Sequence, residues 1–149
     1  MRIAVCSDEP YAVHRTVLAE IARRGHDTVP FGALVDGADH PWADTAEAAA
    51  HAVASGACDE GIFLCWTGTG ISIAANKVGG IRAALCGDAG TASGARVWNH
   101  ANVLCLSNRT LSDDMAKEIL AAWFDTAPGD RGAKGVDRLR DVEARHLKA

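Results

Sequence analysis

A cysteine stands where a buried strand gives way to a glycine loop, and its surroundings are suited to proton-transfer chemistry. The stretch reads Gly61-Ile-Phe-Leu-Cys65-Trp-Thr-Gly-Thr-Gly70 and continues as Ile-Ser-Ile-Ala-Ala-Asn-Lys77. In open α/β sheets, ligands bind at the carboxyl ends of the strands. A thiol there faces the start of the following helix, where free N–H groups lower a cysteine pKa and can hold an anion. These are the parts needed to remove a proton from carbon and to stabilise the resulting oxyanion.

The alternative is that this cysteine simply packs in the core, as free cysteines usually do. We expect that role for Cys6, Cys86 and Cys105, which lie in apolar runs. For Cys65, the glycine loop that follows favours the chemical interpretation. The loop does not match a dinucleotide-binding fingerprint, because Ile73 stands where the third glycine would be.

The elements that must position this cysteine alternate between short apolar runs and amphipathic stretches. The predicted strands are Arg2–Cys6, Asp27–Phe31, Gly61–Cys65, Ile81–Cys86 and Asn102–Leu106. The predicted helices are Ala12–Arg24, Trp42–Ser55, Gly70–Val78, Ala89–Val97 and Ser112–Phe124. Five strands alternating with helices predict an α/β fold with right-handed crossovers and a mostly parallel, doubly wound sheet.

The composition changes after Phe124, which divides the chain into a core (1–124) and a C-terminal arm (125–149) of one domain. Residues 125–135 are rich in glycine, proline and charge. The following stretch, Val136–Leu147, is predicted to be a charged helix with a thin apolar stripe. Because the stripe is too thin for central core, we expect it to pack on a surface groove or on a second subunit.

Charge and composition narrow the classes of partner. The net charge of −4 argues against nucleic acid or an anionic membrane as the main partner. No apolar run approaches the roughly 18 residues of a membrane span, and the N-terminus leads directly into a strand, so we expect no signal peptide. Five cysteines without a Cys-x-x-Cys pair predict neither a disulfide framework nor a zinc site. We therefore expect a cytoplasmic protein without metal or other cofactor.

The segment from Cys65 to Lys77 resembles the signature of the type B ribose-5-phosphate isomerase family, which includes the galactose-6-phosphate isomerase subunits. Weaker similarity extends over nearly the whole chain. The resemblance implies a Rossmann-like three-layer α/β/α sandwich and a homodimer whose active sites are shared between subunits. It also implies interconversion of an aldose and a ketose phosphate through a cis-enediolate, without metal.

The resemblance also implies roles for single residues. Cys65 corresponds to the base that moves a proton between C1 and C2, and Thr67 to the hydroxyl residue beside it. Asp8 would bind substrate hydroxyls, and Asn99 would hold the enediolate oxygen. The residues with binding roles are Gly68, Thr69, Gly70 and Ser72 in the anion-hole loop, and Arg109 and Arg131 at the phosphate.

Five positions depart from the family pattern, mostly where the family binds phosphate or opens the sugar ring. They are Glu9 for histidine, His40 for tyrosine, Trp66 for glycine, Trp98 for the ring-opening histidine, and Gly135 for the second arginine of the arm. A carboxylate beside a phosphate dianion costs roughly 1–4 kcal/mol at about 4 Å. Arg109, Arg131 and Lys134 remain to bind a phosphate in a displaced position. Glu9 alternatively accepts hydrogen bonds from sugar hydroxyls or pairs with Arg131.

Several side chains keep two interpretations. His100 either replaces the missing ring-opening histidine, since imidazole is a natural acid and base near neutral pH, or is a polar loop residue. His40 either donates to a substrate oxygen or lies on the surface. Trp66 and Trp98 are expected to flank the pocket, against the C–H faces of a sugar or filling space left by a smaller substrate. The remaining histidines are expected to be solvated: His14, His26, His51 and His146.

The leading functional hypothesis is an aldose–ketose isomerase of the ribose 5-phosphate type, acting on a sugar phosphate or a related small polyol. A sugar acid, a tetrose derivative or an unphosphorylated sugar is an alternative substrate. A second class is a non-catalytic sugar-binding relative, although a pure binder would not need the thiol. A third, a nucleotide-binding domain of the flavodoxin type, is opposed by the missing fingerprint.

Overall fold

The computed structural model describes residues 1–147, so residues 148 and 149 of the predicted arm lie outside the described part. The strands are β1 (Arg2–Ser7), β2 (Asp27–Gly32), β3 (Glu60–Cys65), β4 (Ala83–Leu85) and β5 (Val103–Ser107). The helices are α1 (His14–Arg23), α2 (Ala33–Asp36), α3 (Trp42–Ala54), α4 (Thr69–Ala75), α5 (Ala89–Asn99), α6 (Asp113–Asp125) and α7 (Ala133–His146), with a 3₁₀ turn at Asp130–Gly132.

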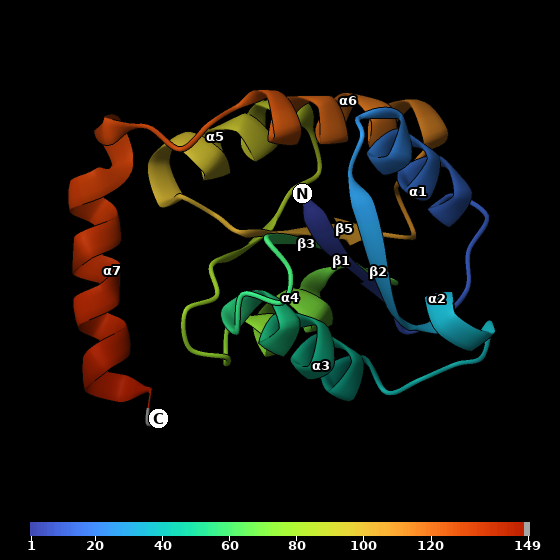
Figure 1. The fold of residues 1–149 in the computed structure, drawn as a ribbon, viewed down its shortest axis with the longest axis horizontal. Helices are drawn as coiled ribbons and strands as arrows, with labels where there is room; N and C mark the ends of the chain where they lie inside the picture. Colours follow the sequence, from blue (N-terminus) through green and yellow to red (C-terminus); the bar gives the residue numbers. More distant parts are fainter. Residues whose placement is uncertain (148–149) are drawn as a thin grey trace.

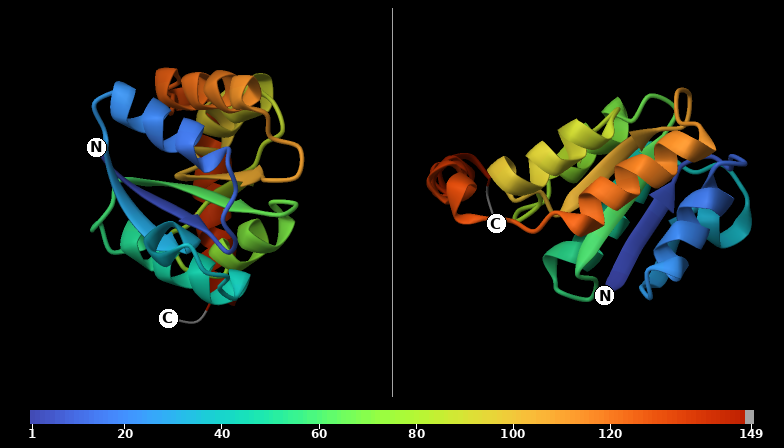
Figure 2. Two further views of the ribbon diagram at one scale, coloured as in Figure 1. Left: turned by 90° about the vertical axis from the view of Figure 1, so that its right-hand side faces the viewer. Right: turned by 90° about the horizontal axis from the view of Figure 1, so that it is seen from above.

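The five strands form one parallel sheet in the order β2-β1-β3-β5-β4. Helices α1, α5 and α6 cover one face and α3 and α4 the other, which makes three layers (Figures 1 and 2). Two apolar clusters fill the spaces between sheet and helices, one on each face. The Rossmann-like α/β fold predicted from the sequence is confirmed, and the sheet is parallel throughout.

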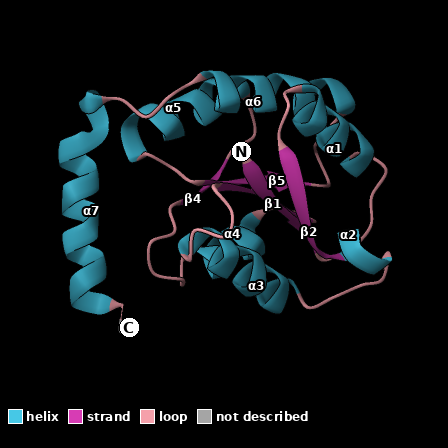
Figure 3. Cartoon of the chain, in the orientation of Figure 1, coloured by secondary structure: helices cyan, strands magenta, loops and turns pink. Residues whose placement is uncertain are grey.

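Central strands read as continuous apolar runs because helices bury both of their faces. Every residue of β3 is buried, and the strand lies between β1 and β5. Figure 3 shows the strands of the sheet lying between the helices of the two faces. Its register pairs Leu64 with Ser7 of β1 and Cys65 with Ser107 of β5. Cys65 therefore ends its strand at the carboxyl edge of the sheet, beside the residues that follow β1 and β5.

Helix boundaries follow from local caps. The Ser112 hydroxyl accepts the N–H of Met115 at 3.1 Å and starts α6, as its position before two aspartates predicts. Helix α4 ends at Ala75, earlier than expected. The Asn76 side chain donates to the carbonyls of Ser72 (3.0 Å) and Ala83 (2.9 Å) and fastens the end of α4 to β4.

Strand β4 is shorter than predicted, because the Arg82 N–H donates to the Asn102 side chain at 2.8 Å and not to a strand. The short helix α2 was not predicted. It spans four residues, too few for a hydrophobic period to show.

A buried ion pair fastens the amino edge of the sheet. Glu60, at the start of β3, accepts from Arg96 of α5 at 2.7 Å and from the indole of Trp123 of α6 at 2.8 Å. The Arg96 guanidinium also lies over the Trp123 ring, 4.8 Å from its centroid. This cluster joins both helices to the central strand.

Helix α7 stands beside the sandwich, next to the β4 side of the sheet, and crosses the levels of all three layers (Figure 1). Val136 is buried, but Leu139 and Val142 are each 45% exposed. The apolar stripe predicted for the arm is therefore only partly covered within one chain.

Candidate active site

The loop between β3 and α4 takes a conformation that requires glycine at residue 68. Gly68 has a φ of +76°, in the left-handed region. A Cβ there would lie 2.5 Å from the Leu85 side chain and 3.0 Å from the backbone of Leu106. The loop therefore turns directly over the ends of β4 and β5, and this holds Cys65 at the carboxyl edge.

Cys65 lies at one cavity of about 320 Å³ with most of the predicted loop residues. The lining residues are Asp8, Trp42, Cys65, Trp66, Thr67, Thr69 and Gly70. The hydroxyls of Thr67 and Thr69 are 2.7 Å apart and share a hydrogen bond. Asp8 lies in the loop after β1, which we call the first loop, far in sequence from Cys65. Its carboxylate nevertheless borders the same cavity as the Cys65 thiol and the two threonine hydroxyls.

Asp8 contributes an acceptor without a partner in this cavity. Its side chain is buried, and among the described residues its Oδ1 has no hydrogen-bond partner. Burial raises the pKa of Asp8, and the charges of Glu9 and Asp39 act in the same direction, opposed by backbone hydrogen bonds. A buried polar oxygen is costly to leave unpaired, so a ligand hydroxyl would satisfy it.

Two positions that depart from the family pattern, Glu9 and Trp66, contact the same tyrosine. The Tyr11 hydroxyl donates to Glu9 Oε2 at 2.6 Å, and its ring stacks on Trp66 with centroids 5.7 Å apart and planes at 26°. The hydrogen bond to Glu9 raises the pKa of Tyr11 to about 12. Sequence reasoning missed Tyr11, because its contacts depend on how the first loop folds over the strand ends.

His14 is buried, so the expectation that it is solvated is wrong. Its Nδ1 accepts the N–H of Tyr11 at 3.3 Å, which leaves Nε2–H to donate to the side-chain Oδ1 of Asn108 at 2.9 Å. The Asn108 amide donates to Ser7 Oγ at 3.2 Å, and Ser7 donates to the carbonyl of Glu9 at 2.8 Å. Burial lowers the pKa of His14, which keeps the neutral ring that this network requires.

Arg109 lies on the opposite side of the loop. Its backbone N–H donates to the carbonyl of Trp66 at 2.9 Å, and it lines a neighbouring cavity of about 340 Å³. That cavity is lined by Thr67, Leu85, Cys86, Gly87, Ser107, Arg109 and Thr110. Because Thr67 borders both cavities, a cation and hydroxyls stand next to the space that holds the thiol.

Two predicted site residues turn their side chains elsewhere. Ser72 lies within α4, where its backbone N–H donates to the carbonyl of Gly68 at 3.3 Å, and its hydroxyl acts on the pKa of the buried Cys105 thiol, lowering it against the larger rise from burial. The His40 ring contacts Asp36 at 2.9 Å in a separate cavity, although the His40 N–H donates to the carbonyl of Asp8 at 2.8 Å. His40 thus supports the first loop through its backbone, not through its imidazole.

The predicted residues of α5 and the arm lie far from Cys65 within one chain. Helix α5 begins after β4 and ends at Asn99 before β5, so its end lies at the amino edge of the sheet, about 16 Å from its start. Trp98 is 53% exposed, and Arg131 lies over its ring at 5.2 Å. The His100 ring donates to the carbonyl of Gly129 at 2.8 Å. Trp98 therefore does not flank the Cys65 cavity within this chain.

The start of the arm packs closely on this end of α5. A Cβ at Gly132 would lie 2.4 Å from the carbonyl oxygen of Val97 and 2.7 Å from that of Trp98. Arg131 is therefore fixed beside Trp98 and Asn99, and exposed Lys134 follows at the start of α7. These residues form a second group, separate from the cavity of Cys65.

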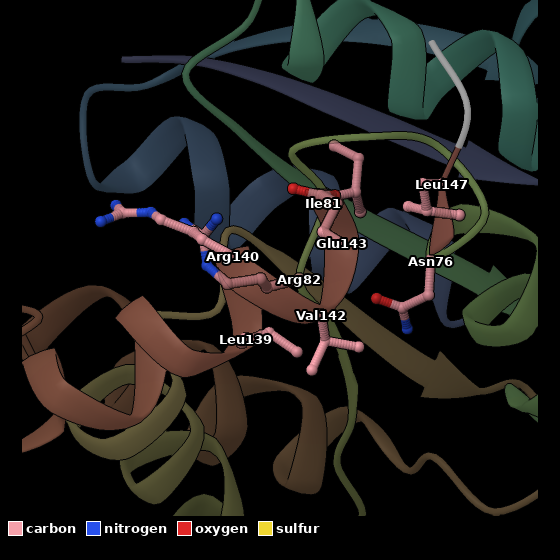
Figure 4. A pocket seen from close by; sticks show the side chains of 8 residues that line it. All are labelled: Asn76, Ile81, Arg82, Leu139, Arg140, Val142, Glu143 and Leu147. Carbon is pink, nitrogen blue, oxygen red and sulfur yellow. The ribbon is translucent and has the colours of Figure 1, made fainter. Parts of the chain in front are cut away.

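A further cavity of about 280 Å³ lies between α7 and the segment before β4 (Figure 4). Four of its lining residues are apolar (Ile81, Leu139, Val142 and Leu147) and four are polar or charged (Asn76, Arg82, Arg140 and Glu143), without a thiol, hydroxyl or histidine. It therefore lacks the groups that the proposed isomerase chemistry needs.

The other predicted core cysteines are buried, as expected. Burial raises the pKa of Cys86 to about 11 and raises those of Cys6 and Cys105 further. Among residues 1–147, no group of three histidine, cysteine or acidic side chains is arranged to hold a metal ion. In the same residues, no helix is long and apolar enough to cross a membrane.

The chain matches known isomerases over most of its length. The family model described as Ribose/Galactose Isomerase matches residues 3–139. D-erythrulose-4-phosphate isomerase of Pectobacterium atrosepticum is 39% identical over 125 residues, 83% of this chain and 82% of that one. Ribose-5-phosphate isomerase B of Escherichia coli is 34% identical over 142 residues, 94% of each chain.

Solved structures agree with these matches. Ribose-5-phosphate isomerase B of Clostridium thermocellum superposes with a TM-score of 0.91 at 37% identity, covering 98% of this chain and 99% of that one. The chain therefore belongs to the ribose/galactose isomerase family. It is an intramolecular oxidoreductase that interconverts an aldose and a ketose, of the sugar-phosphate isomerase type.

Proposed function

We propose that Cys65 is the base of this isomerase and carries a proton between C1 and C2 of an open-chain sugar. The observation that carries the proposal is the shared cavity: a strand-end thiol and the unpaired, buried Oδ1 of Asp8 border the same space. The thiolate removes the C2 proton of the aldose, and the electrons form an enediolate with its negative charge on O1. The C2 hydroxyl proton passes to O1, and the thiol returns its proton to C1 to give the ketose. Asp8 holds a substrate hydroxyl while this happens.

The loop residues supply the remaining polar contacts. Thr67 and Thr69 place two hydroxyls beside the thiol. We propose that the backbone N–H groups from Gly68 to Ile71 stabilise the oxyanion, a contribution that is typically worth a hundredfold or more in turnover. The Ser72 N–H is not included, because it donates to the carbonyl of Gly68 at 3.3 Å. The sequence assigns no metal to this reaction, and every proposed step uses protein groups alone.

The proposed substrate is a short sugar phosphate. The relatives named above are an erythrulose 4-phosphate and a ribose 5-phosphate isomerase, so four and five carbons are both candidates. Arg109, in the cavity that shares Thr67 with Cys65, supplies a cation for the phosphate. An unphosphorylated sugar or sugar acid is the alternative, and the absence of any catalysed exchange would identify a sugar-binding relative.

We further propose that the active protein is a homodimer with sites shared between subunits. Asn99, His100, Arg131 and Lys134 cannot reach Cys65 within one chain, because α5 ends at the opposite edge of the sheet. Helix α7 carries Leu139 and Val142 half exposed, which gives a second copy an apolar surface to cover. In the dimer, Asn99 of the partner would complete the site. A cytoplasmic location stays a prediction.

The experiment that tests this function follows proton exchange at carbon. The protein is incubated in D₂O with four- and five-carbon aldoses, with and without phosphate, and deuterium at C1 and C2 is followed by NMR. Cys65→Ala and Cys65→Ser should lower exchange and isomerisation by at least about a hundredfold, the lower range for general-base catalysis. Cys58→Ala is the matched control, since Cys58 is buried just before β3, away from the cavity.

A Cys65→Ser variant that kept more than about a hundredth of wild-type turnover would refute the thiol as base. Wild-type protein that exchanged no proton on any of these sugars would refute the catalytic proposal as a whole. Thermal unfolding of each variant, followed by circular dichroism, separates loss of chemistry from loss of fold.

A further inference from the structure

Tyr11 connects the two residues that make the first-loop side of the cavity unusual. One end of its side chain donates a hydrogen bond to the Glu9 carboxylate at 2.6 Å, and its ring stacks on Trp66. Trp66 borders the cavity beside Cys65. The positions of the Glu9 carboxylate and the Trp66 indole are therefore coupled, because both side chains contact Tyr11.

Tyr11 is itself held in place by His14. Its N–H donates to His14, and its ring meets the His14 ring edge-on with centroids 5.9 Å apart. His14 is anchored through Asn108 to Ser7, at the end of β1. Both ring nitrogens of the neutral histidine are used, so Tyr11 has a fixed support.

The resulting wall limits the room around Cys65. Trp66 borders one part of the cavity and Trp42 another, and Trp42 packs against Gly70, where a Cβ would lie only 3.1 Å from its ring. Both indoles are about half exposed, Trp66 at 50% and Trp42 at 47%, and each has one flat contact: Trp66 stacks on Tyr11, and Trp42 lies against Gly70. A substrate chain must fit between two large, supported side chains.

Charge sets the direction of the substrate in this space. Asp8, Glu9 and Asp39 gather on the first-loop side, and their mutual repulsion contributes to the raised pKa of Asp8. A substrate anion is repelled there and attracted to Arg109 beyond Thr67. The Arg109 backbone N–H donates to the carbonyl of Trp66, and Thr67 borders both cavities, so the space beside the base and the space beside Arg109 adjoin. A short substrate chain is enough to span two adjoining spaces.

We propose that Tyr11 is a specificity-determining residue that locks Trp66 and Glu9 into one wall and restricts the substrate to a four-carbon sugar phosphate. This inference rests on the proposed isomerase function. A five-carbon chain adds a carbon–carbon bond of about 1.5 Å. A misplacement of about 1 Å at a reacting centre can cost about a hundredfold in rate. The wall formed by Trp66 and Glu9 thus selects substrates by the length of their carbon chain, and not by their affinity for phosphate alone.

The test compares kcat/KM for D-erythrose 4-phosphate and D-ribose 5-phosphate. Wild-type protein should favour the four-carbon sugar by at least about tenfold, the lower end for one methylene-sized group in a pocket. Trp66→Gly removes the wall, and Tyr11→Leu removes its support. Both should lower the preference at least about tenfold, mainly by raising activity on the five-carbon sugar.

Two variants serve as controls. Tyr11→Phe keeps the stacked ring and loses only the hydrogen bond to Glu9, so the preference should fall less than in Tyr11→Leu, where both contacts are lost. Phe124→Leu removes an aromatic ring on α6 that packs on His26, remote from the cavity, and should leave the preference unchanged. Melting temperatures show whether each variant is folded.

The outcomes distinguish the specificity proposal from the proposed isomerase function. Wild-type turnover with no preference for the four-carbon sugar would contradict the specificity proposal but not the isomerase function. Equal losses of activity on both sugars in Trp66→Gly and Tyr11→Leu would do the same. Turnover of no sugar at all, with no proton exchange, would instead overturn the proposed function.

Discussion

The carboxyl edge and the amino edge of the sheet differ in how completely their side chains are packed within one chain. At the carboxyl edge, Cys65 and Asp8 border a cavity whose supports are buried and hydrogen-bonded within one chain. At the amino edge, Trp98 and Asn99 lie at the end of α5 beside an arm whose apolar stripe is half exposed. The first edge is assembled within one chain, whereas the second keeps an apolar stripe half exposed. The comparison supports our proposal that one chain supplies two different halves of a shared site.

The largest expected effect comes from keeping these halves apart. Leu139→Asp combined with Val142→Asp places two charges on the α7 stripe and should give a folded monomer. Without a partner's Asn99 at the Cys65 cavity, turnover should fall by about a hundredfold or more. Size-exclusion chromatography and turnover on the same samples check this.

The matched control for these charges is Val35→Asp, on α2, because Val35 is 66% exposed and lies in a different element. It should leave both assembly and turnover as in the wild type. A fully active monomeric Leu139→Asp, Val142→Asp protein would contradict the division between the two edges.

A smaller effect is expected on the free energy of unfolding, where two glycine variants distinguish backbone strain from close packing at the carboxyl edge. Gly68 and Gly56 have nearly equal φ values of +76° and +78°, but only at Gly68 would an added Cβ have neighbours within 4 Å. Gly56→Ala should cost about 1–2 kcal/mol from the left-handed conformation alone. Gly68→Ala should cost about 1–3 kcal/mol more, because its Cβ meets Leu85 and the Leu106 backbone.

Urea unfolding measures both free energies of unfolding. Turnover should fall for Gly68→Ala only, since this loop holds Cys65 and Thr67. Equal destabilisation of the two variants would mean that the close approach of the loop to β5 carries no energy.

The smallest effect concerns pH. Burial lowers the pKa of His14, so just below its ordinary value near 6.5 the unfolded chain binds a proton that the folded chain does not. Stability contributed by neutral His14 is therefore complete above about pH 6.5 and is lost as the pH falls toward the folded pKa. The extra slope is at most about 1.4 kcal/mol per pH unit.

Denaturant unfolding between pH 5 and 8 would show this slope in the wild type and not in His14→Gln. His51→Gln, an exposed position on α3, is the control and should keep the wild-type slope. Identical slopes for wild type and His14→Gln would remove the argument that the first loop depends on a neutral histidine.

Much of the framework could be predicted from the sequence. Alternating apolar runs predicted all five strands and the long helices, and the position of Cys65 before a glycine loop predicted the edge at which the cavity lies. These features depend on residues close together in the chain. The structure places Asp8, Thr67 and Arg109 around that loop, although their catalytic and binding roles stay predictions.

The supports of the site could not be predicted in the same way. Tyr11, His14 and Asn108 meet only because Ser7 ends β1 beside Leu64 and the loop after β5 folds over both strands. Ser72 was assigned to the anion-hole loop, but its N–H donates to the carbonyl of Gly68, and His40, for which a substrate contact and a surface position were both open, pairs with Asp36. Such contacts depend on strand register and loop path, which no local pattern encodes.

The central claim, one active site built from opposite edges of two subunits, can be tested directly with mixed dimers. Cys65→Ala and Asn99→Ala chains, each inactive alone, are co-expressed with different tags. Random pairing makes about half of the dimers mixed, and each mixed dimer has one intact site, so about a quarter of wild-type activity should return. Pairing Cys65→Ala with Thr67→Ala, both at the same edge, should restore none. Absence of activity in the first mixture, or equal recovery in both, would contradict the account.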